Sequence, residues 1–299
     1  MDMLRITGLQ KRFGDKEVLR GLDLVVPENS IFGFIGKNGA GKTTTMKTVL
    51  GLMKPDAGEI YVHGEKVVYG ATPTNRFIGY LPDVPEFYSF MTAAEYLRFC
   101  GQITGLKAPE LEERSRELLV MVGLGDEKHR IKGFSRGMKQ RLGIAQALLN
   151  RPKLLICDEP TSALDPVGRK EILDILLSVR EQTTVLLSTH ILSDVERICT
   201  DVAVLNDGVV EIQGKISDLK SKYRSLEYQL ETENVCDTQA LLQEFPQAKP
   251  SGRNQLIFCE TDTDPFAVMG FVKDHRINLL KWERVEPTLE ALFMEVAGK

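Results

Sequence analysis

The sequence predicts an α/β fold in which a mostly parallel sheet is covered by helices on both faces, followed by a smaller α+β domain. Short apolar runs bounded by turn residues predict three buried strands, at 31–35, 153–157 and 183–188. Stretches with helical spacing lie between these runs, and such alternation is typical of parallel sheets with both faces buried. The chain has 299 residues, which favours two domains because a domain takes about 150 residues.

The first strands are predicted at 4–6 and 18–26, on either side of a turn at 13–16. Helical patterns in the same domain occur at 42–52, 92–122 and 167–181. The pattern at 92–122 is rich in Glu and Arg and interrupts the strand-helix alternation. It predicts an inserted helical subdomain at about 84–150.

A polar segment rich in Lys and Ser, at 214–224, predicts the boundary between a domain at 1–217 and a second domain at 224–299. Strands of the second domain are predicted at 226–230, 256–259 and 277–282, and helices at 238–244, 265–275 and 288–296. About 75 residues are enough for a domain that folds alone.

Composition excludes several classes of protein. Hydrophobic residues make up 42% and charged residues 27% of the chain, with a formal net charge of -4, so neither a disordered chain nor a basic nucleic-acid-coating protein is expected. No apolar run approaches the ~18–20 residues that span a bilayer, and the first residues do not resemble a signal peptide. The 5 cysteines are scattered without a C-x-x-C pair, so we expect neither a metal site built from cysteines nor a disulfide framework. These features predict a cytosolic protein with no membrane anchor of its own.

A complete G-x-x-x-x-G-K-[ST] motif follows the strand at 31–35 and precedes the helix at 42–52. Its glycines let backbone N–H groups turn toward a polyphosphate at the start of a helix. In this motif the lysine contacts the β- and γ-phosphates and the following hydroxyl ligates Mg²⁺. The alternative is a glycine-rich link between a strand and a helix. The predicted nucleotide-binding residues are Gly36, Asn38, Gly39, Ala40, Gly41, Lys42, Thr43 and Thr44.

The apolar strand at 153–157 is followed by two carboxylates, Asp158 and Glu159. An aspartate at the end of such a strand holds the Mg²⁺ of the nucleotide, and the next carboxylate is placed to orient and deprotonate the attacking water. The alternative is that both side chains solvate the strand end. With the phosphate loop upstream, the sequence contains both halves of a Mg-nucleotide site.

Three further motifs complete an ordered series: Phe-Ser-Arg-Gly-Met-Lys-Gln-Arg at 134–141, Ser-Ala-Leu-Asp at 162–165 and Leu-Ser-Thr-His at 187–190. The series resembles the nucleotide-binding domain of ATP-binding cassette (ABC) transporters over residues 2–217. The resemblance implies a P-loop NTPase core with a parallel sheet, an antiparallel β subdomain and an inserted helical subdomain. It also implies ATP and Mg²⁺ as ligands, and ATP hydrolysis.

The resemblance implies roles for individual residues. Phe13 would stack on adenine, the alternative being a core or turn aromatic. Ser135 and Gly137 would contact the γ-phosphate that the opposite subunit binds, and Asp165 would lie at the dimer seam between the two sites. His190 would bind the γ-phosphate and position the catalytic carboxylate and the water.

Two motifs depart from the family pattern: the signature at 134–138, which reads Phe-Ser-Arg-Gly-Met instead of Leu-Ser-Gly-Gly-Gln but keeps Ser135 and Gly137, and the segment that ends at Asp83. Arg136 stands where the family motif Leu-Ser-Gly-Gly-Gln has glycine, and we expect its side chain to point outward with no catalytic role. Asp83 stands where the family usually has glutamine. It either ligates Mg²⁺ with Thr43 and Asp158 or solvates its loop, and its charge lies beside the γ-phosphate.

The chain contains one copy of each motif, so the resemblance implies a second cassette subunit, identical or paralogous, and a transmembrane permease subunit on which the pair acts. The aromatic segment 85–92 is expected to receive a cytoplasmic helix of that subunit, the alternative being that Phe87, Tyr88 and Phe90 pack inside the helical subdomain. Residues 135–141 and 286–293 look most like bacterial exporter ATPases of drug, antibiotic-peptide or sodium-extrusion systems. The second domain resembles their accessory domain, with a role in dimer contact, regulation or partner binding.

The sequence thus predicts an ATP-hydrolysing motor subunit of a bacterial exporter, peripheral on the inner face of the cell membrane, with no nucleic-acid partner. One alternative is a soluble cassette ATPase that acts on the ribosome or DNA. Such proteins usually carry two cassettes or a long coiled-coil insertion, and no heptad run lies between residues 43 and 135. Another alternative is a regulatory protein that binds ATP without turnover, which Glu159 and His190 argue against.

Overall fold

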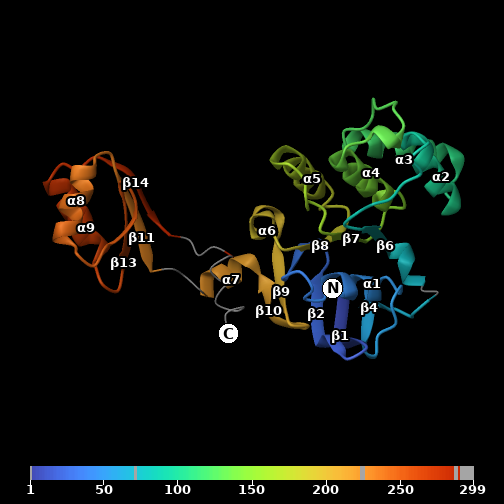
Figure 1. The fold of residues 1–299 in the computed structure, drawn as a ribbon, viewed down its shortest axis with the longest axis horizontal. Helices are drawn as coiled ribbons and strands as arrows, with labels where there is room; N and C mark the ends of the chain where they lie inside the picture. Colours follow the sequence, from blue (N-terminus) through green and yellow to red (C-terminus); the bar gives the residue numbers. More distant parts are fainter. Residues whose placement is uncertain (1, 71–72, 223–225, 286–288, 290–299) are drawn as a thin grey trace. The chain divides into compact units, whose positions relative to one another are not determined.

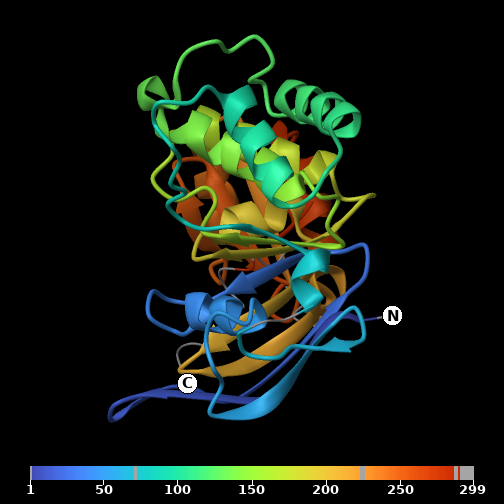
Figure 2. The same ribbon diagram turned by 90° about the vertical axis from the view of Figure 1, so that its right-hand side faces the viewer.

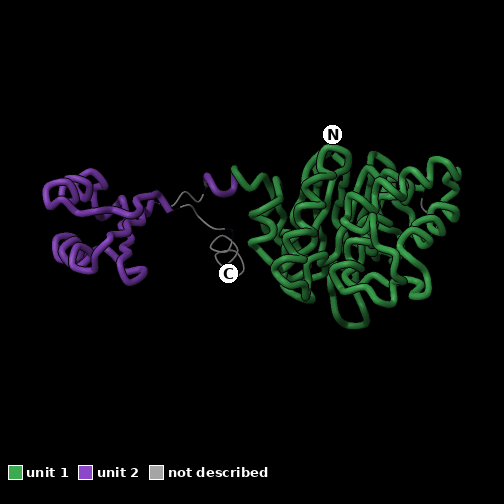
Figure 3. The backbone as a smooth tube through the Cα atoms, turned by 90° about the horizontal axis from the view of Figure 1, so that it is seen from above, with its two compact units in different colours: residues 1–217, 295–299 green, residues 218–294 purple. Residues whose placement is uncertain are grey.

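The computed structural model describes residues 2–70, 73–222, 226–285 and 289. They form two units, the first ending at Ser217 and the second beginning at Asp218 (Figure 3). Helix α7 (Ile216–Lys222) spans this point, within the polar segment where the sequence predicts a boundary. The predicted helix at 288–296 lies outside the described residues, apart from Leu289.

A six-stranded sheet forms the centre of the first unit, in the order β10-β9-β3-β8-β7-β6. All neighbours in this sheet are parallel except the edge strand β10, which runs antiparallel to β9. The strands are β3 (Ile31–Ile35), β6 (Ile78–Leu81), β7 (Leu154–Asp158), β8 (Thr184–Thr189), β9 (Asp201–Asn206) and β10 (Val209–Lys215). The strands predicted at 31–35, 153–157 and 183–188 are confirmed to within one residue at either end.

Successive residues of the central strands face two different cores, as the two-residue period of a strand requires. In β7, Leu155 and Cys157 pack with the helical region, whereas Leu154 and Ile156 pack with α1 and the N-terminal strands. Every residue of β7 is therefore buried. Because both faces are apolar, the sheet requires a layer on each side.

On one side lies an antiparallel sheet in the order β2-β1-β4-β5 (Figure 1). It consists of β1 (Asp2–Phe13), β2 (Lys16–Pro27), β4 (Ala57–Val62) and β5 (Glu65–Lys66). The strands predicted at 4–6 and 18–26 are present but longer, and β4, β5, β6, β9 and β10 were not predicted. Helix α1 (Lys42–Val49) ends earlier than the predicted 42–52, because the chain turns at Gly51 with a φ of 68°.

On the other side lie the helices (Figure 2), namely α2 (Ala93–Ile103), α3 (Ala108–Met121), α4 (Arg136–Leu148), α5 (Pro166–Ser178) and α6 (Leu192–Ile198). The predicted helical pattern at 92–122 is two helices, separated at Gly105 with a φ of 82°. A reciprocal capping box between Thr92 and Glu95 begins α2, and satisfies backbone N–H groups that the first turn leaves free.

The contact between β6 and α4 depends on a glycine. A Cβ atom at Gly79 would lie 2.2 Å from the carbonyl oxygen of Ala147, so Gly79→Ala requires the strand and helix to separate. We expect a loss of about 1–3 kcal/mol in unfolding free energy, measured as a lower urea midpoint by circular dichroism. Gly133→Ala is the control, since no atom lies within 4 Å of its Cβ position. Equal midpoints for the two variants would show that this contact does not constrain the fold.

The second unit is a four-stranded antiparallel sheet, β12-β13-β11-β14, with two helices. Its elements are β11 (Glu227–Thr232), α8 (Val235–Glu244), β12 (Lys249–Gly252), β13 (Gln255–Cys259), α9 (Pro265–Asp274) and β14 (Leu279–Arg284). Their order along the chain is β-α-β-β-α-β, which with this strand arrangement is the ferredoxin-like topology. Its core contains Leu230, Leu241, Phe258 and Val268. The sequence missed only β12 of these, a strand with no buried residue.

None of the helices in the part of the chain that the structure describes is both long and apolar enough to cross a bilayer.

Candidate functional site

A cavity of about 480 Å³ lies where several strands of the parallel sheet end. The loop after β3 reaches it, as do Glu159 after β7 and His190 after β8. The carboxyl ends of parallel strands meet at one edge of a sheet, which is the usual position of a ligand site in such folds. The residues lining the cavity are Val18, Asn38, Gly39, Gly41, Lys42, Thr43, Thr44, Asp83, Glu159, Ser162 and His190.

The loop before α1 exposes backbone donors to this cavity. Gly41 is the N-cap of α1 with a φ of 114°, and no side chain bonds to the first turn of the helix from this position. A Cβ at Gly41 would lie 2.7 Å from Leu19 Cδ2 and 3.3 Å from the carbonyl oxygen of Val18, so only glycine fits against β2. The free N–H groups and the helix dipole make this end of α1 a site for an anion.

The Lys42 ammonium is buried at the floor of the loop, with 6% of its side chain exposed. Its Nζ donates to the carbonyl oxygen of Gly36 at 2.7 Å and lies 3.2 Å from Glu159 Oε1. The ammonium is thus held between a loop carbonyl and a carboxylate. A polyphosphate bound to the loop would replace Glu159 as the anionic partner of Lys42.

Thr43 and Asp158 lie together. The Thr43 hydroxyl donates to Asp158 Oδ2 at 2.8 Å, and the Ser188 hydroxyl donates to Asp158 Oδ1 at 2.6 Å. A hydroxyl and a carboxylate are hard oxygen ligands, the kind that Mg²⁺ prefers, so this pair fits the predicted metal role. Ser188 was not predicted as a site residue. Its position near the end of β8, two residues before His190, could have identified it.

Glu159 has a left-handed backbone, with a φ of 49°, which is unusual for a residue with a side chain and occurs often at functional sites. The N–H of Glu159 donates to the hydroxyl and carbonyl oxygens of Ser188 at 3.0 and 3.1 Å. His190 Nδ1 lies 2.8 Å from Oε2, while Oε1 is buried and makes no hydrogen bond within the described residues. Oε1 faces the Lys42 ammonium at 3.2 Å, so this oxygen can accept a proton once that ion pair opens.

A buried network links the segment after Glu159 to α6. Asp194 is buried, accepts a hydrogen bond from the Thr161 hydroxyl at 2.7 Å and forms an ion pair with Arg169 of α5. Because Asp194 follows His190 by four residues, this network holds the chain on both sides of the Glu159–His190 contact. This network was not predicted, since each member is an ordinary polar residue in the sequence and the contacts form only when the elements pack.

Several predicted residues lie outside the cavity lining. The Phe13 ring is 47% exposed at the end of β1, with Lys11 Nζ 5.5 Å from its centroid. The Ser135 hydroxyl caps α4 by accepting from Met138 N–H at 3.2 Å, and Asp165 caps α5 by accepting from Gly168 N–H at 3.2 Å. Gly36, Ala40, Gly137 and Asp158 are also absent from the lining. The roles of Phe13, Ser135, Gly137 and Asp165 stay predictions.

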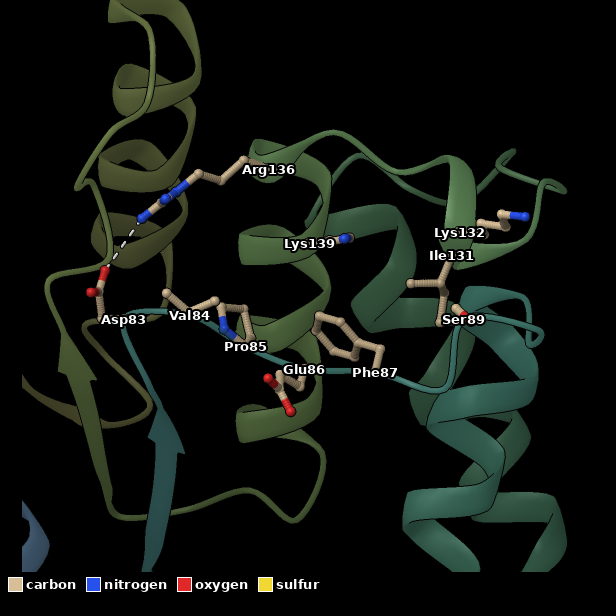
Figure 4. A pocket seen from close by; sticks show the side chains of 10 residues that line it. All are labelled: Asp83, Val84, Pro85, Glu86, Phe87, Ser89, Ile131, Lys132, Arg136 and Lys139. Carbon is tan, nitrogen blue, oxygen red and sulfur yellow. Dashed lines mark hydrogen bonds and ion pairs between the residues drawn. The ribbon is translucent and has the colours of Figure 1, made fainter.

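Asp83 lines the cavity, but its carboxylate pairs with Arg136. Arg136 NH2 lies 3.4 Å from Asp83 Oδ1 (Figure 4), and the Arg136 side chain is 43% exposed, so it reaches the carboxylate while remaining open to solvent. Burial raises the pKa of Asp83, and the nearby Asp158 and Glu159 raise it further against the lowering effect of Arg136. Among the described residues, no three carboxylate, imidazole or thiol groups gather into a metal site. Asp83 as a third Mg²⁺ ligand remains a prediction.

The chain is similar to known ATP-binding proteins. A family model described as "ABC transporter" matches residues 19–162. The uncharacterized ABC transporter ATP-binding protein YxlF of Bacillus subtilis (strain 168) is 44% identical over 75% of this chain and 74% of its own length. The bacitracin transport ATP-binding protein BcrA of Bacillus licheniformis is 39% identical over 78% and 76% of the two chains. The linearmycin resistance ATP-binding protein LnrL of Bacillus subtilis (strain 168) is 30% identical over 99% of both chains.

Solved structures share the fold. An ATP-binding subunit of an ABC transporter superposes with a TM-score of 0.65 and 34% identity, over 74% of this chain and 93% of its own. A dimeric ATP-binding cassette, in a post-hydrolysis state bound to ADP and Pi, superposes with a TM-score of 0.64 and 26% identity, over 72% and 99% of the chains. The α/β fold class predicted from the sequence is confirmed.

Proposed function

This chain belongs to the family of ABC transporter ATP-binding proteins, and on that premise we propose that it is the motor subunit of a bacterial exporter. It binds ATP and is an ATPase, as its family membership requires. The observation that carries the proposal is the meeting of Lys42, Glu159 and His190 around the phosphate loop. The names of two relatives, which refer to bacitracin transport and linearmycin resistance, support export as the direction of transport.

Glu159 would act as the general base. Its Oε1, once released by Lys42, accepts the proton of the attacking water, while His190 holds Oε2 and fixes the plane of the carboxylate. Lys42 leaves its ion pair with Glu159 when it binds the phosphates, which releases the carboxylate for this role. Mg²⁺, held by Thr43 and Asp158, would neutralise charge on the phosphates.

A second cassette would complete each site. Proteins of this family dimerise, and the N-terminus of α4 with Ser135 and Gly137 lies outside the chain's own cavity. We place these residues at the γ-phosphate held by the other subunit, and Asp165 at the seam. Ser135 keeps its cap while the N–H groups of the first turn of α4 remain available for an anion.

The membrane partner would dock in a second cavity, of about 460 Å³, beside the helical region. This groove is lined by Asp83, Val84, Pro85, Glu86, Phe87, Ser89, Ile131, Lys132, Arg136 and Lys139 (Figure 4). Phe87 packs edge-on against Tyr96 and forms part of the wall, whereas Tyr88 and Phe90 are 51% and 61% exposed. In the predicted aromatic segment, one ring is therefore packed and two are largely exposed. We propose that a cytoplasmic helix of the membrane partner binds in this groove. Such docking would place the chain on the inner face of the membrane.

Residues 224–299 would form the accessory domain of the exporter-type subgroup. The ferredoxin-like unit has a core of its own, and the match to LnrL extends over 99% of the chain. We assign it a role in contact with the second cassette or the partner.

Capture from detergent-solubilised native membranes tests this function. The Glu159→Gln protein with ATP and Mg²⁺ is expected to bring down a polytopic membrane protein. Adding Val84→Glu, in the groove and 62% exposed, is expected to abolish capture, whereas Val68→Glu, 55% exposed and outside the groove lining, leaves it intact. Capture of ribosomal or DNA-repair components instead would favour a non-transport cassette ATPase and overturn the proposal.

A further inference from the structure

Two of the residues that depart from the family pattern, Asp83 and Arg136, contact each other. Asp83 follows β6 and Arg136 begins α4, 53 residues later, yet their side chains form an ion pair at 3.4 Å (Figure 4). Resting on the proposed function, we propose that Arg136 is a positioning residue for ATP binding. It holds the Asp83 carboxylate in an ion pair at the wall of the nucleotide cavity, so that the two departures form one compensated unit.

The position of Arg136 in its helix supports this pairing. It is the first residue of α4, and the first turn contains no acidic residue. The positive end of the helix dipole disfavours a cation at this position. Asp83 supplies the missing negative charge from a different element.

The backbones that carry the pair are fixed against each other. The carbonyl oxygen of Asp83 accepts a 2.7 Å hydrogen bond from Nε2 of Gln140, a fully buried residue of α4. A Cβ at Gly143 would lie 2.5 Å from Leu81 Cδ1 and 3.4 Å from Pro85 Cβ. Strand end and helix are therefore in direct contact on both sides of Asp83, and the Arg136 side chain extends from the helix to the Asp83 carboxylate (Figure 4).

The negative charge of Asp83 is what links the ion pair to nucleotide binding. Asp83 shares the cavity with Glu159 and lies close enough to Asp158 and Glu159 for both to raise its pKa. Without Arg136 it would add an uncompensated negative charge beside a polyphosphate, which weakens binding by repulsion. Both side chains are nearly half exposed, and a pair so exposed contributes little to folding stability. Its expected contribution is thus to nucleotide affinity.

A double-mutant cycle on the isolated full-length protein tests the proposal. In a Glu159→Gln background, Arg136→Gly is expected to weaken Mg-ATP affinity by about tenfold, a coupling typical of contacting charged residues. Adding Asp83→Gln, which recreates the usual family pair, is expected to restore affinity to within about twofold of the parent. With Glu159 present, the same changes should raise KM far more than they lower kcat, which a merely structural role would not do.

Arg180→Gly is the matched control, because Arg180 is an exposed arginine in the turn after α5 and outside the cavity lining. It is expected to have the same effect with and without Asp83→Gln. An Arg136→Gly effect of equal size in both backgrounds, or no effect in either, overturns the proposal. Failure to capture a membrane protein would instead overturn the transport function and leave this coupling measurable.

Discussion

Replacing Glu159 by Gln is expected to lower the ATPase rate by about two to four orders of magnitude, the contribution of a general base. Glutamine has nearly the same shape, and its amide can keep the contact with His190 Nδ1 that Glu159 Oε2 makes at 2.8 Å in the native protein. Its amide cannot accept the proton that Oε1 accepts. Phosphate release measures the rate, and titration with Mg-ATP is expected to show binding retained.

Glu181→Gln serves as the control, since Glu181 is exposed in the turn before β8 and is expected to leave the rate unchanged. Equal ATPase rates for Glu159→Gln and the native protein would remove the catalytic assignment. That result would favour the regulatory protein that binds ATP without turnover.

Replacing Lys42 by Ala is expected to weaken ATP binding by about 2–5 kcal/mol, the cost of truncating one member of a buried charged pair. The ammonium is the buried cation of the phosphate loop, held by Gly36 and Glu159 within 3.2 Å. Its loss leaves the polyphosphate without this contact and Glu159 without its ion-pair partner. Isothermal titration with Mg-ATP measures the affinity.

The same loop provides a stringent control. Lys37 is exposed, so Lys37→Ala removes an equal charge from the loop without removing a buried contact, and binding is expected to stay within about threefold because screening weakens exposed charges. If both variants lost affinity equally, general electrostatic attraction by the loop would explain binding, and the specific role of Lys42 would be wrong.

The contacts in the site indicate the order of events in ATP binding and hydrolysis. In the structure, Lys42 contacts Glu159, and the two charges compensate each other. On the proposed function, binding of a polyphosphate would replace Glu159 as the partner of Lys42 and leave the carboxylate to His190 and the water. The base is thereby available when substrate is present.

Local sequence was enough to predict the phosphate loop, whose residues all lie in one short segment. The glycines at 36–41, Lys42 and Thr43 form their loop because the turn and helix start are encoded within eight residues. The strand at 31–35 could be predicted because an apolar run between turn residues has one stable place, inside the sheet. The acidic end of β7 could be predicted for the same reason, whereas the role of His190 came from the resemblance to ABC transporters.

Polar strands could not be predicted. The edge strands β5 (Glu65–Lys66) and β12 (Lys249–Gly252) have no apolar pattern, and they form because a neighbouring strand offers hydrogen-bonding groups. Each pairs with the strand next to it in the chain, β4 or β13, so its formation depends on the hydrogen-bonding edge of that neighbour and not on its own residue types.

The sequence by itself determined the phosphate loop, the acidic strand end and the class of fold, because each rests on a short pattern of residue types. Only the tertiary structure decided that Asp83 pairs with Arg136, that Ser188 holds Asp158, and that Asp194 links α5 to α6. These contacts join residues 25 to 53 positions apart. They exist because apolar packing of the strands and helices brings their polar ends to one edge of the sheet, and no local pattern records which side chains meet there.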